Sequence, residues 1–100
     1  MVDLNRALRT AAQTGEVTLG YKTTRIAASD KTAKAVVLAR NMPEDAREAV
    51  LEAAEDGGVP IIEFQGTNVE LGPALGKPFA VSAAAILEPG ESDVLQAARR

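Results

Sequence analysis

The chain has 100 residues, 46% of them hydrophobic and 25% charged, which is the composition of one compact globular domain and excludes a disordered chain. It contains no cysteine, which excludes disulfides and thiolate metal sites, and no histidine, which removes the commonest general base, so we expect no enzyme activity, no cofactor and no metal. The net charge of −3 argues at first sight against a nucleic-acid partner.

Two elements are predicted before residue 20. Asp3 is expected to cap a helix in which apolar residues recur at helical spacing up to Ala12, and Gly15 ends this helix. Residues 17–19 then predict a short strand that ends at Gly20.

A second helix and a buried strand follow. The helical pattern over residues 21–30 is weaker than the first. We expect Ile26 and Ala27 to point inward. Lys22 and Arg25 are expected to point outward. Residues 35–39 are apolar without a break, which is typical of a strand covered on both faces.

The clearest helical pattern begins at Pro43. Proline suits the first turn of a helix because its missing N–H is not needed there, and two acidic residues follow it. The buried stripe is predicted to consist of Ala46, Ala49, Val50, Ala53 and Ala54. Gly57 and Gly58 end the helix, and residues 59–64 predict the next strand.

The last third of the chain predicts one more helix and one more strand. Thr67 and Glu70 have the spacing of a capping box, which opens a short helix that residues 72–73 (Gly-Pro) are expected to break. Residues 79–87 predict a long strand, and residues 92–95 an extended tail.

Strands alternate with helices, and some strands are apolar throughout. We therefore predict an α/β fold, a three-layer α/β/α sandwich with a mixed sheet of about four strands. The start of the chain lacks the apolar region of a secretory signal, and no apolar stretch is long enough to cross a bilayer, so we expect a soluble cytoplasmic protein without membrane contact. The covered sheet leaves no long apolar stripe, which predicts a monomer.

Charge is distributed unevenly along the chain. Residues 1–42 carry seven basic and three acidic side chains, whereas residues 43–100 carry four basic and eleven acidic ones. One interpretation is a basic face that meets a polyanion. The alternative is a solvated surface whose charges are unevenly placed.

Ligands of open α/β sheets collect at the carboxyl ends of strands, and three loops there are polar. In the first, Gly20 allows close approach to the backbone and Lys22 adds charge at a helix start, which favours a phosphate; a tight turn alone would also explain the glycine. In the second, Asn41 either caps a helix or presents its carboxamide to a base edge. In the third, Phe79 and Val81 form either an apolar shelf for an unstacked base or part of the core.

Five stretches occur in the order of one known family: residues 15–24 (GEVTLGYKTT), 39–41 (ARN), 64–72 (FQGTNVELG), 75–79 (LGKPF) and 87–95 (LEPGESDVL). Together they resemble the archaeal and eukaryotic large-subunit ribosomal protein thirty ("30e") family, which belongs to the kink-turn-binding superfamily. That superfamily has the three-layer sandwich already predicted.

The resemblance implies a structural protein of the large ribosomal subunit, a single RNA-binding domain over residues 1–100 with neighbouring ribosomal proteins as further partners. It would bind and stabilise a kink-turn of ribosomal RNA, a sharply bent internal loop with sheared G·A pairs and an extruded nucleotide. By resemblance, Lys22 supplies charge, Asn41 bonds a guanine, and residues 79–81 pack against the extruded nucleotide. The residues expected at the RNA are Gly20, Tyr21, Lys22, Thr23, Arg25, Asn41, Met42, Phe79, Ala80 and Val81.

The chain departs from other branches of the superfamily in one motif. Those branches often carry Asn-Glu after the glycine, where this chain has Tyr21 and Lys22, as the thirty branch does. Two alternatives stay open. One is the same RNA-binding mode in another ribonucleoprotein or in regulation of the chain's own transcript, and the other is a small α/β domain that binds a phosphorylated ligand.

Overall fold

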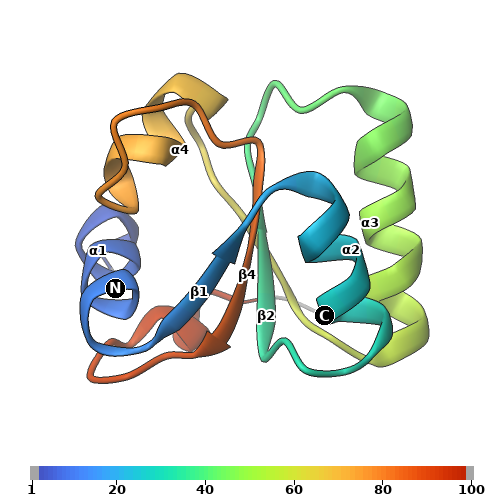
Figure 1. Ribbon diagram of the computed structural model, residues 1–100, viewed down its shortest axis with the longest axis horizontal. Coiled ribbons are helices and arrows are strands. Elements are labelled where there is room, and N and C mark those ends of the chain that lie inside the picture. Colours follow the sequence, from blue (N-terminus) through green and yellow to red (C-terminus); the bar gives the residue numbers. More distant parts are fainter. Residues whose placement is uncertain (1–2, 99–100) are drawn as a thin grey trace.

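The computed structural model describes residues 3–98, in which two layers of helices enclose a four-stranded mixed sheet (Figure 1). The elements in chain order are α1 (Leu4–Thr14), β1 (Glu16–Leu19), α2 (Tyr21–Ser29), β2 (Ala35–Leu38), α3 (Glu44–Gly57), β3 (Ile61–Glu63), α4 (Asn68–Ala74), β4 (Ala83–Glu88) and the 3₁₀ helix η1 (Val94–Ala97). Helices α1 and α4 cover one face of the sheet, and α2 and α3 cover the other (Figure 1). The predicted three-layer sandwich is confirmed.

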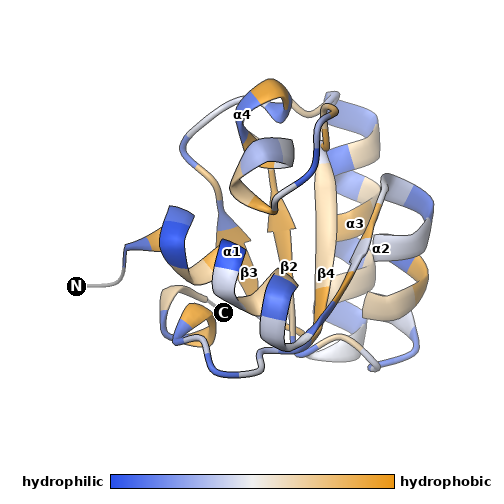
Figure 2. Cartoon of the chain, turned by 60° about the vertical axis from the view of Figure 1, so that its left-hand side comes forward, coloured by the Kyte–Doolittle hydropathy of each residue, from blue (hydrophilic) through white to orange (hydrophobic). Residues whose placement is uncertain are grey.

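The sheet has the strand order β1-β4-β2-β3. Strand β4 runs antiparallel to both of its neighbours, whereas β2 and β3 are parallel. The two central strands are buried on both faces, which explains why the sequence shows unbroken apolar runs there (Figure 2).

Alternate residues of β2 belong to two separate cores. Val37 packs with α1 and α4, whereas Val36 and Leu38 pack with α2 and α3, and all three side chains are fully buried. Each such side chain stabilises the fold by about 1.5–3 kcal/mol. Small residues at 83–85 in β4 face both layers and let the helices approach the sheet closely.

Helix α4 was expected to break at Gly72 and Pro73, but it continues to Ala74. Pro73 is exposed and removes only the hydrogen bond that its own N–H would have made to Val69, while the Leu75 N–H still donates to the Leu71 carbonyl at 3.1 Å. The predicted break was therefore wrong.

Strand β4 begins at Ala83 rather than at Phe79. The reason lies in a long-range contact: the Val81 N–H donates to the Asn68 carbonyl at 3.0 Å instead of to a neighbouring strand. Residues 79–82 thereby form a loop against α4. Strand β3 is also shorter than predicted, and residues 94–97 form η1 instead of an extended tail because Val94 is buried against the α1 side of the core.

Two predicted helix faces need correction. In α2 the buried residues are Thr24, Ala27 and Ala28, and their spacing turns Ile26 outward, where it is 56% exposed. In α3 only two residues of the predicted stripe are fully buried, Val50 and Ala54, and the three alanines are half-buried. Across residues 3–98, no helix combines the length and the apolar character that a membrane span requires.

Candidate nucleic-acid interface

Four loops meet at one end of the sheet, the upper end in Figure 1. We call this surface the rim and define it as residues 20–23, 39–42, 66–68 and 79–82. Backbone hydrogen bonds connect these segments. The donor N–H and the acceptor carbonyl are, in turn, those of Gly20 and Ala83, Ala39 and Ser82, Arg40 and Gly66 (each 2.9 Å), and Val81 and Asn68 (3.0 Å). The three predicted binding loops therefore lie on one surface, and the β3–α4 loop completes it.

Gly20 shapes the start of α2. Its φ of 103° lies in a region that side chains disfavour, and a Cβ added there would meet no atom within 4 Å, so the surface above it is open. No side chain caps α2, which leaves first-turn N–H groups available to an anionic acceptor. Lys22 and Thr23 are exposed beside them, and the Arg25 guanidinium lies 5.9 Å from the centre of the Tyr21 ring.

Asn41 makes a reciprocal pair with Asn68. The Asn41 Nδ2 donates to the Asn68 Oδ1 at 3.0 Å, and the Asn68 backbone N–H donates to the Asn41 Oδ1 at 2.8 Å. Asn41 therefore satisfies a first-turn N–H of α4, not of α3, whose N-cap is Pro43. Because each carboxamide oxygen already accepts one bond, the groups most available to a ligand are N–H donors, one on Asn41 and two on Asn68.

The third loop holds Phe79 with its side chain 54% exposed. Its carbonyl oxygen approaches Gly72 of α4 so closely that a Cβ at residue 72 would lie 1.7 Å from it. Only glycine at position 72 allows this approach. Ala80 is exposed as well. The loop thus presents an exposed aromatic ring beside α4.

Two predicted RNA-binding residues are part of the core. Met42 is 5% exposed and Val81 is 4% exposed, packed in the α2–α3 and α1–α4 layers respectively. Their side chains therefore contribute almost nothing to the outer surface in this structure. The exposed apolar surface beside these positions comes from Phe79 and Ala80.

Asn68 is not among the residues that the sequence predicts at the RNA. The capping box of Thr67 and Glu70 accounted for that segment, and it is present in the structure. Its hydrogen-bond partner, Asn41, lies 27 positions away in the chain, so the sequence alone does not show that the two side chains meet.

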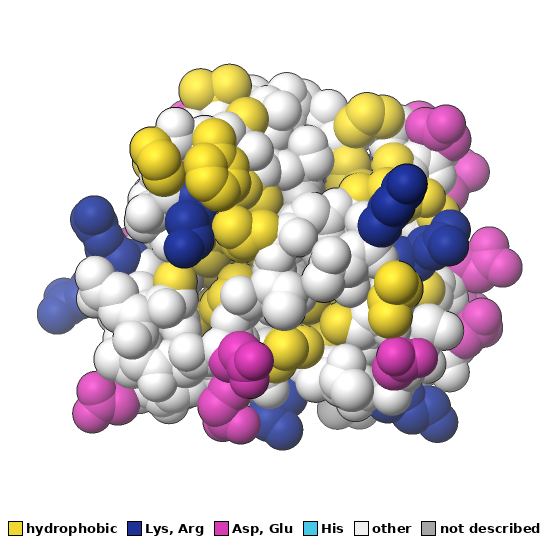
Figure 3. Space-filling view, in the orientation of Figure 1, with side chains coloured by type: hydrophobic (Ala, Val, Ile, Leu, Met, Phe, Trp, Pro, Cys, Tyr) yellow, Lys and Arg dark blue, Asp and Glu magenta, His cyan; other side chains and the backbone are white. Residues whose placement is uncertain are grey.

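Charge on the surface follows the uneven distribution along the sequence. Lys and Arg side chains stand on the α1 side and near α2, whereas Asp and Glu side chains gather along α3 and at the lower end of the molecule (Figure 3). Helix α3 carries six acidic residues on its exposed positions: Glu44, Asp45, Glu48, Glu52, Glu55 and Asp56. A polyanion would therefore approach the rim and the α1 side rather than α3.

The profile of the Ribosomal protein L7Ae/L30e/S12e/Gadd45 family matches residues 3–96. The chain belongs to this family. The resemblance to its L30e branch is supported by relatives named "Large ribosomal subunit protein eL30": that of Methanosarcina mazei is 46% identical over 96% of this chain and 89% of its own length. The eL30 proteins of Pyrobaculum islandicum and Methanothermobacter thermautotrophicus are 40% and 41% identical, covering 96% and 95% of this chain and 95% and 97% of their own lengths.

These family members are archaeal ribosomal proteins and not enzymes, in agreement with the expectation for this chain. A solved structure from Bacillus halodurans, of a protein of unknown function, has a TM-score of 0.82, covers 97% of this chain and 96% of its own, and is 20% identical. That similarity supports the α/β sandwich.

Proposed function

We propose that this protein is a structural constituent of the large ribosomal subunit that binds a kink-turn of ribosomal RNA through the rim and stabilises its bent form. Its archaeal relatives are named as proteins of the large subunit, so its place would be the ribosome in the cytoplasm. The observation that carries the proposal is the convergence of Lys22, Asn41 and Phe79 on one surface whose loops are bonded to one another.

Each part of the rim offers a different contact. The open N–H groups of α2 and the Lys22 ammonium suit a phosphate. The free N–H of Asn41 suits an acceptor on a guanine edge, and the exposed ring of Phe79 suits a base that has left the stack. A straight A-form duplex offers none of these base contacts, because its major groove is too narrow to read.

Binding would act by selecting one RNA conformation. A free internal loop samples bent and extended forms, and a rim that fits only the bent form shifts the population toward it. A differential affinity of about 3–5 kcal/mol would turn a rare bent form into the dominant one. The hydrogen bonds between the loops favour affinity, because a preformed surface loses little conformational freedom on binding.

The test compares two RNAs of equal length and charge. One contains a kink-turn, and in the other Watson–Crick pairs replace the sheared G·A pairs. We expect binding to the kink-turn RNA to be at least about 100-fold tighter, since specific RNA contacts add to a common phosphate attraction. Equal affinity for the two RNAs would refute the proposed function.

A further inference from the structure

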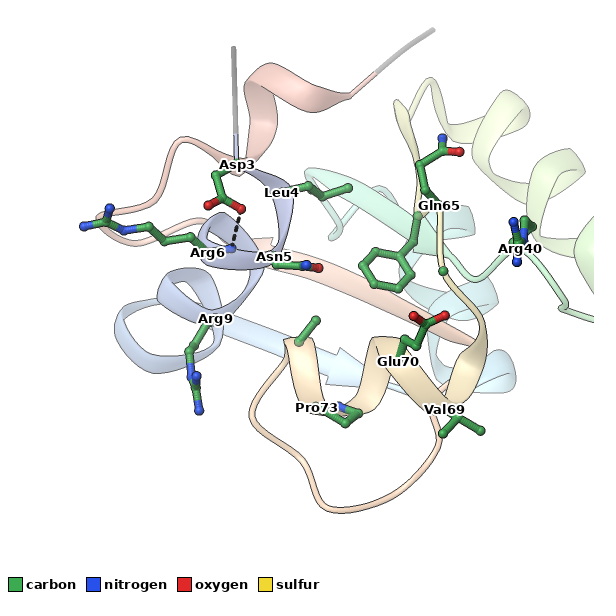
Figure 4. Close-up of a pocket in the computed structure, with 13 residues that line it drawn as sticks. Asp3, Leu4, Asn5, Arg6, Arg9, Arg40, Gln65, Val69, Glu70 and Pro73 are labelled. Atoms are coloured by element: carbon green, nitrogen blue, oxygen red, sulfur yellow. Dashed lines mark hydrogen bonds between the residues drawn. The ribbon is translucent and has the colours of Figure 1, made fainter.

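A hollow of about 1260 Å³ opens between α1 and α4, next to the rim (Figure 4). Leu4, Phe64 and Ala74 contribute apolar surface to it. Three arginines line it: Arg6 and Arg9 extend from α1, with the Arg6 guanidinium directed away from the hollow, and Arg40 follows β2 on the other side (Figure 4). Arg6 and Arg9 lie outside the rim, and Arg40 is a rim residue whose side chain is not used in the contacts proposed for the kink-turn.

The guanidinium groups of these arginines have no carboxylate partner among the described residues. In residues 3–98 the one ion pair is that of Arg47 with Glu63. Two carboxylates also line the hollow, but both serve helix starts: Asp3 accepts from the Arg6 N–H at 3.3 Å, and Glu70 accepts from the Thr67 N–H at 2.8 Å. The positive helix ends offset these two negative charges. Arg6 also lines a neighbouring hollow, together with Asp3, Glu91 and Asp93.

The hollow is continuous with the rim. Arg40 precedes Asn41, and its backbone N–H is bonded to the Gly66 carbonyl. Val69, which lines the hollow and is 66% exposed, follows Asn68 on α4. An RNA strand that leaves the rim over the start of α4 therefore reaches the hollow directly.

We propose that this hollow is a second RNA site, which binds phosphates of an RNA segment outside the kink-turn through Arg6, Arg9 and Arg40. The inference rests on the proposed function and adds a contact to it. Guanidinium groups without carboxylate partners favour phosphate, because their planar donors match its oxygens in pairs. The acidic surface of α3 leaves the α1–α4 side as the face along which RNA continues.

The first test uses the variant Arg6→Gln/Arg9→Gln with two RNAs, a short kink-turn hairpin and the full-length large-subunit ribosomal RNA of Methanosarcina mazei. We expect unchanged affinity for the hairpin within about twofold, a loss of about tenfold or more for the long RNA, and a salt slope reduced by about 1.5 for the two lost phosphate contacts. The matched control is Lys31→Gln/Lys34→Gln, which removes the same charge from exposed positions before β2, at the opposite end of the sheet.

Affinity for the long RNA within twofold of the wild-type value, or the same loss in the control, would overturn the proposal. So would an equal loss on hairpin and long RNA, because the arginines would then belong to the kink-turn contact. If the wild-type protein fails to prefer the kink-turn but still needs Arg6 and Arg9 for the long RNA, the proposed function fails and the second site stands.

A second test asks whether the occupant of the hollow is RNA or protein. The chain has no cysteine, so Asn5→Cys gives one attachment point in the hollow for an iron chelate that generates hydroxyl radicals. In large subunits assembled with this variant, we expect cleavage of ribosomal RNA outside the kink-turn, and no such cuts from Ser29→Cys on α2. Damage confined to a neighbouring protein would overturn the proposal.

Discussion

Asn41 and Asn68, 27 residues apart in the sequence, are joined by two hydrogen bonds. One links their carboxamides, and in the other the Asn68 backbone N–H donates to the Asn41 side-chain oxygen. This pair fastens the β2–α3 loop to the first turn of α4 before any ligand arrives. It leaves one N–H of the Asn41 side chain and two of the Asn68 side chain free to donate to a ligand. The rim is thereby suited to an acceptor edge, as guanine presents.

Asn41→Ala is expected to weaken kink-turn binding by about 1–3 kcal/mol, the value of a good base-edge contact. It also leaves a first-turn N–H of α4 without its acceptor, which lowers the free energy of unfolding by about 1 kcal/mol. Calorimetric titration and urea unfolding measure the two effects separately. Asn41→Asp is the informative companion, since it keeps an acceptor for the Asn68 N–H but removes the donors, so it should lose affinity with a smaller loss of stability. Unchanged affinity in Asn41→Ala would remove this residue from the interface.

Phe79→Ala and Val81→Ala form a matched pair two residues apart. Phe79 is 54% exposed and packs against little of the core, so its truncation should cost about 1–3 kcal/mol of RNA binding and leave thermal stability nearly unchanged. Val81 is 4% exposed, and its truncation should instead lower the free energy of unfolding by about 1–3 kcal/mol. The reverse pattern in melting curves and titrations would mean that the loop presents the wrong side chain.

Gly72→Ala places a methyl group 1.7 Å from the Phe79 carbonyl oxygen in the present geometry. Either α4 or the 79–82 loop must move, at a cost of about 1–3 kcal/mol in unfolding free energy. Because the displaced loop carries Phe79, RNA affinity should fall as well, even at temperatures where the variant is fully folded. Pro73→Ala, at an exposed position of the same helix, is the control and should keep full affinity. A Gly72→Ala variant with wild-type stability would show that this close approach is not needed.

Lys22→Ala should reduce both affinity for the kink-turn and the dependence of that affinity on salt. One lost phosphate contact lowers the slope of log K against log salt by about 0.7–0.9. Lys34→Ala makes the same change of charge at the far end of the sheet and should leave the slope unaltered. Equal slopes for the Lys22→Ala protein and the wild-type protein would place its ammonium away from phosphate.

Much of the fold could be predicted because its signals are local. The apolar run at residues 35–39, the Asp3 cap and the capping box of Thr67 with Glu70 each depend on a few adjacent residues, and all appear in the structure. The errors fall where a distant residue decides the outcome. Residues 79–82 have strand-like composition, but a hydrogen bond to Asn68 holds them as a loop.

The candidate site shows the same division. The carboxyl ends of strands β1 and β2 predicted that residues 20–23 and 39–42 would meet. Residues 79–82 enter β4 at its amino end and lie on the same surface because β4 is antiparallel to β1 and β2. The sequence did not show which side chains face outward. Phe79 and Val81 are both apolar and lie in the same segment, yet Phe79 is exposed and Val81 is buried. Asn68 became visible only when Asn41, its hydrogen-bond partner, was placed beside it.

The most direct measurement follows the shape of the RNA itself. A kink-turn RNA labelled with a donor and an acceptor fluorophore at its two stem ends reports the bend by energy transfer as protein is added without divalent ions. Stabilisation of the bent form by the rim predicts a rise in transfer that saturates with wild-type protein and is strongly reduced with the double variant Lys22→Ala/Asn41→Ala. Tight binding without any rise in transfer would contradict the claim that this protein holds ribosomal RNA in a bent shape.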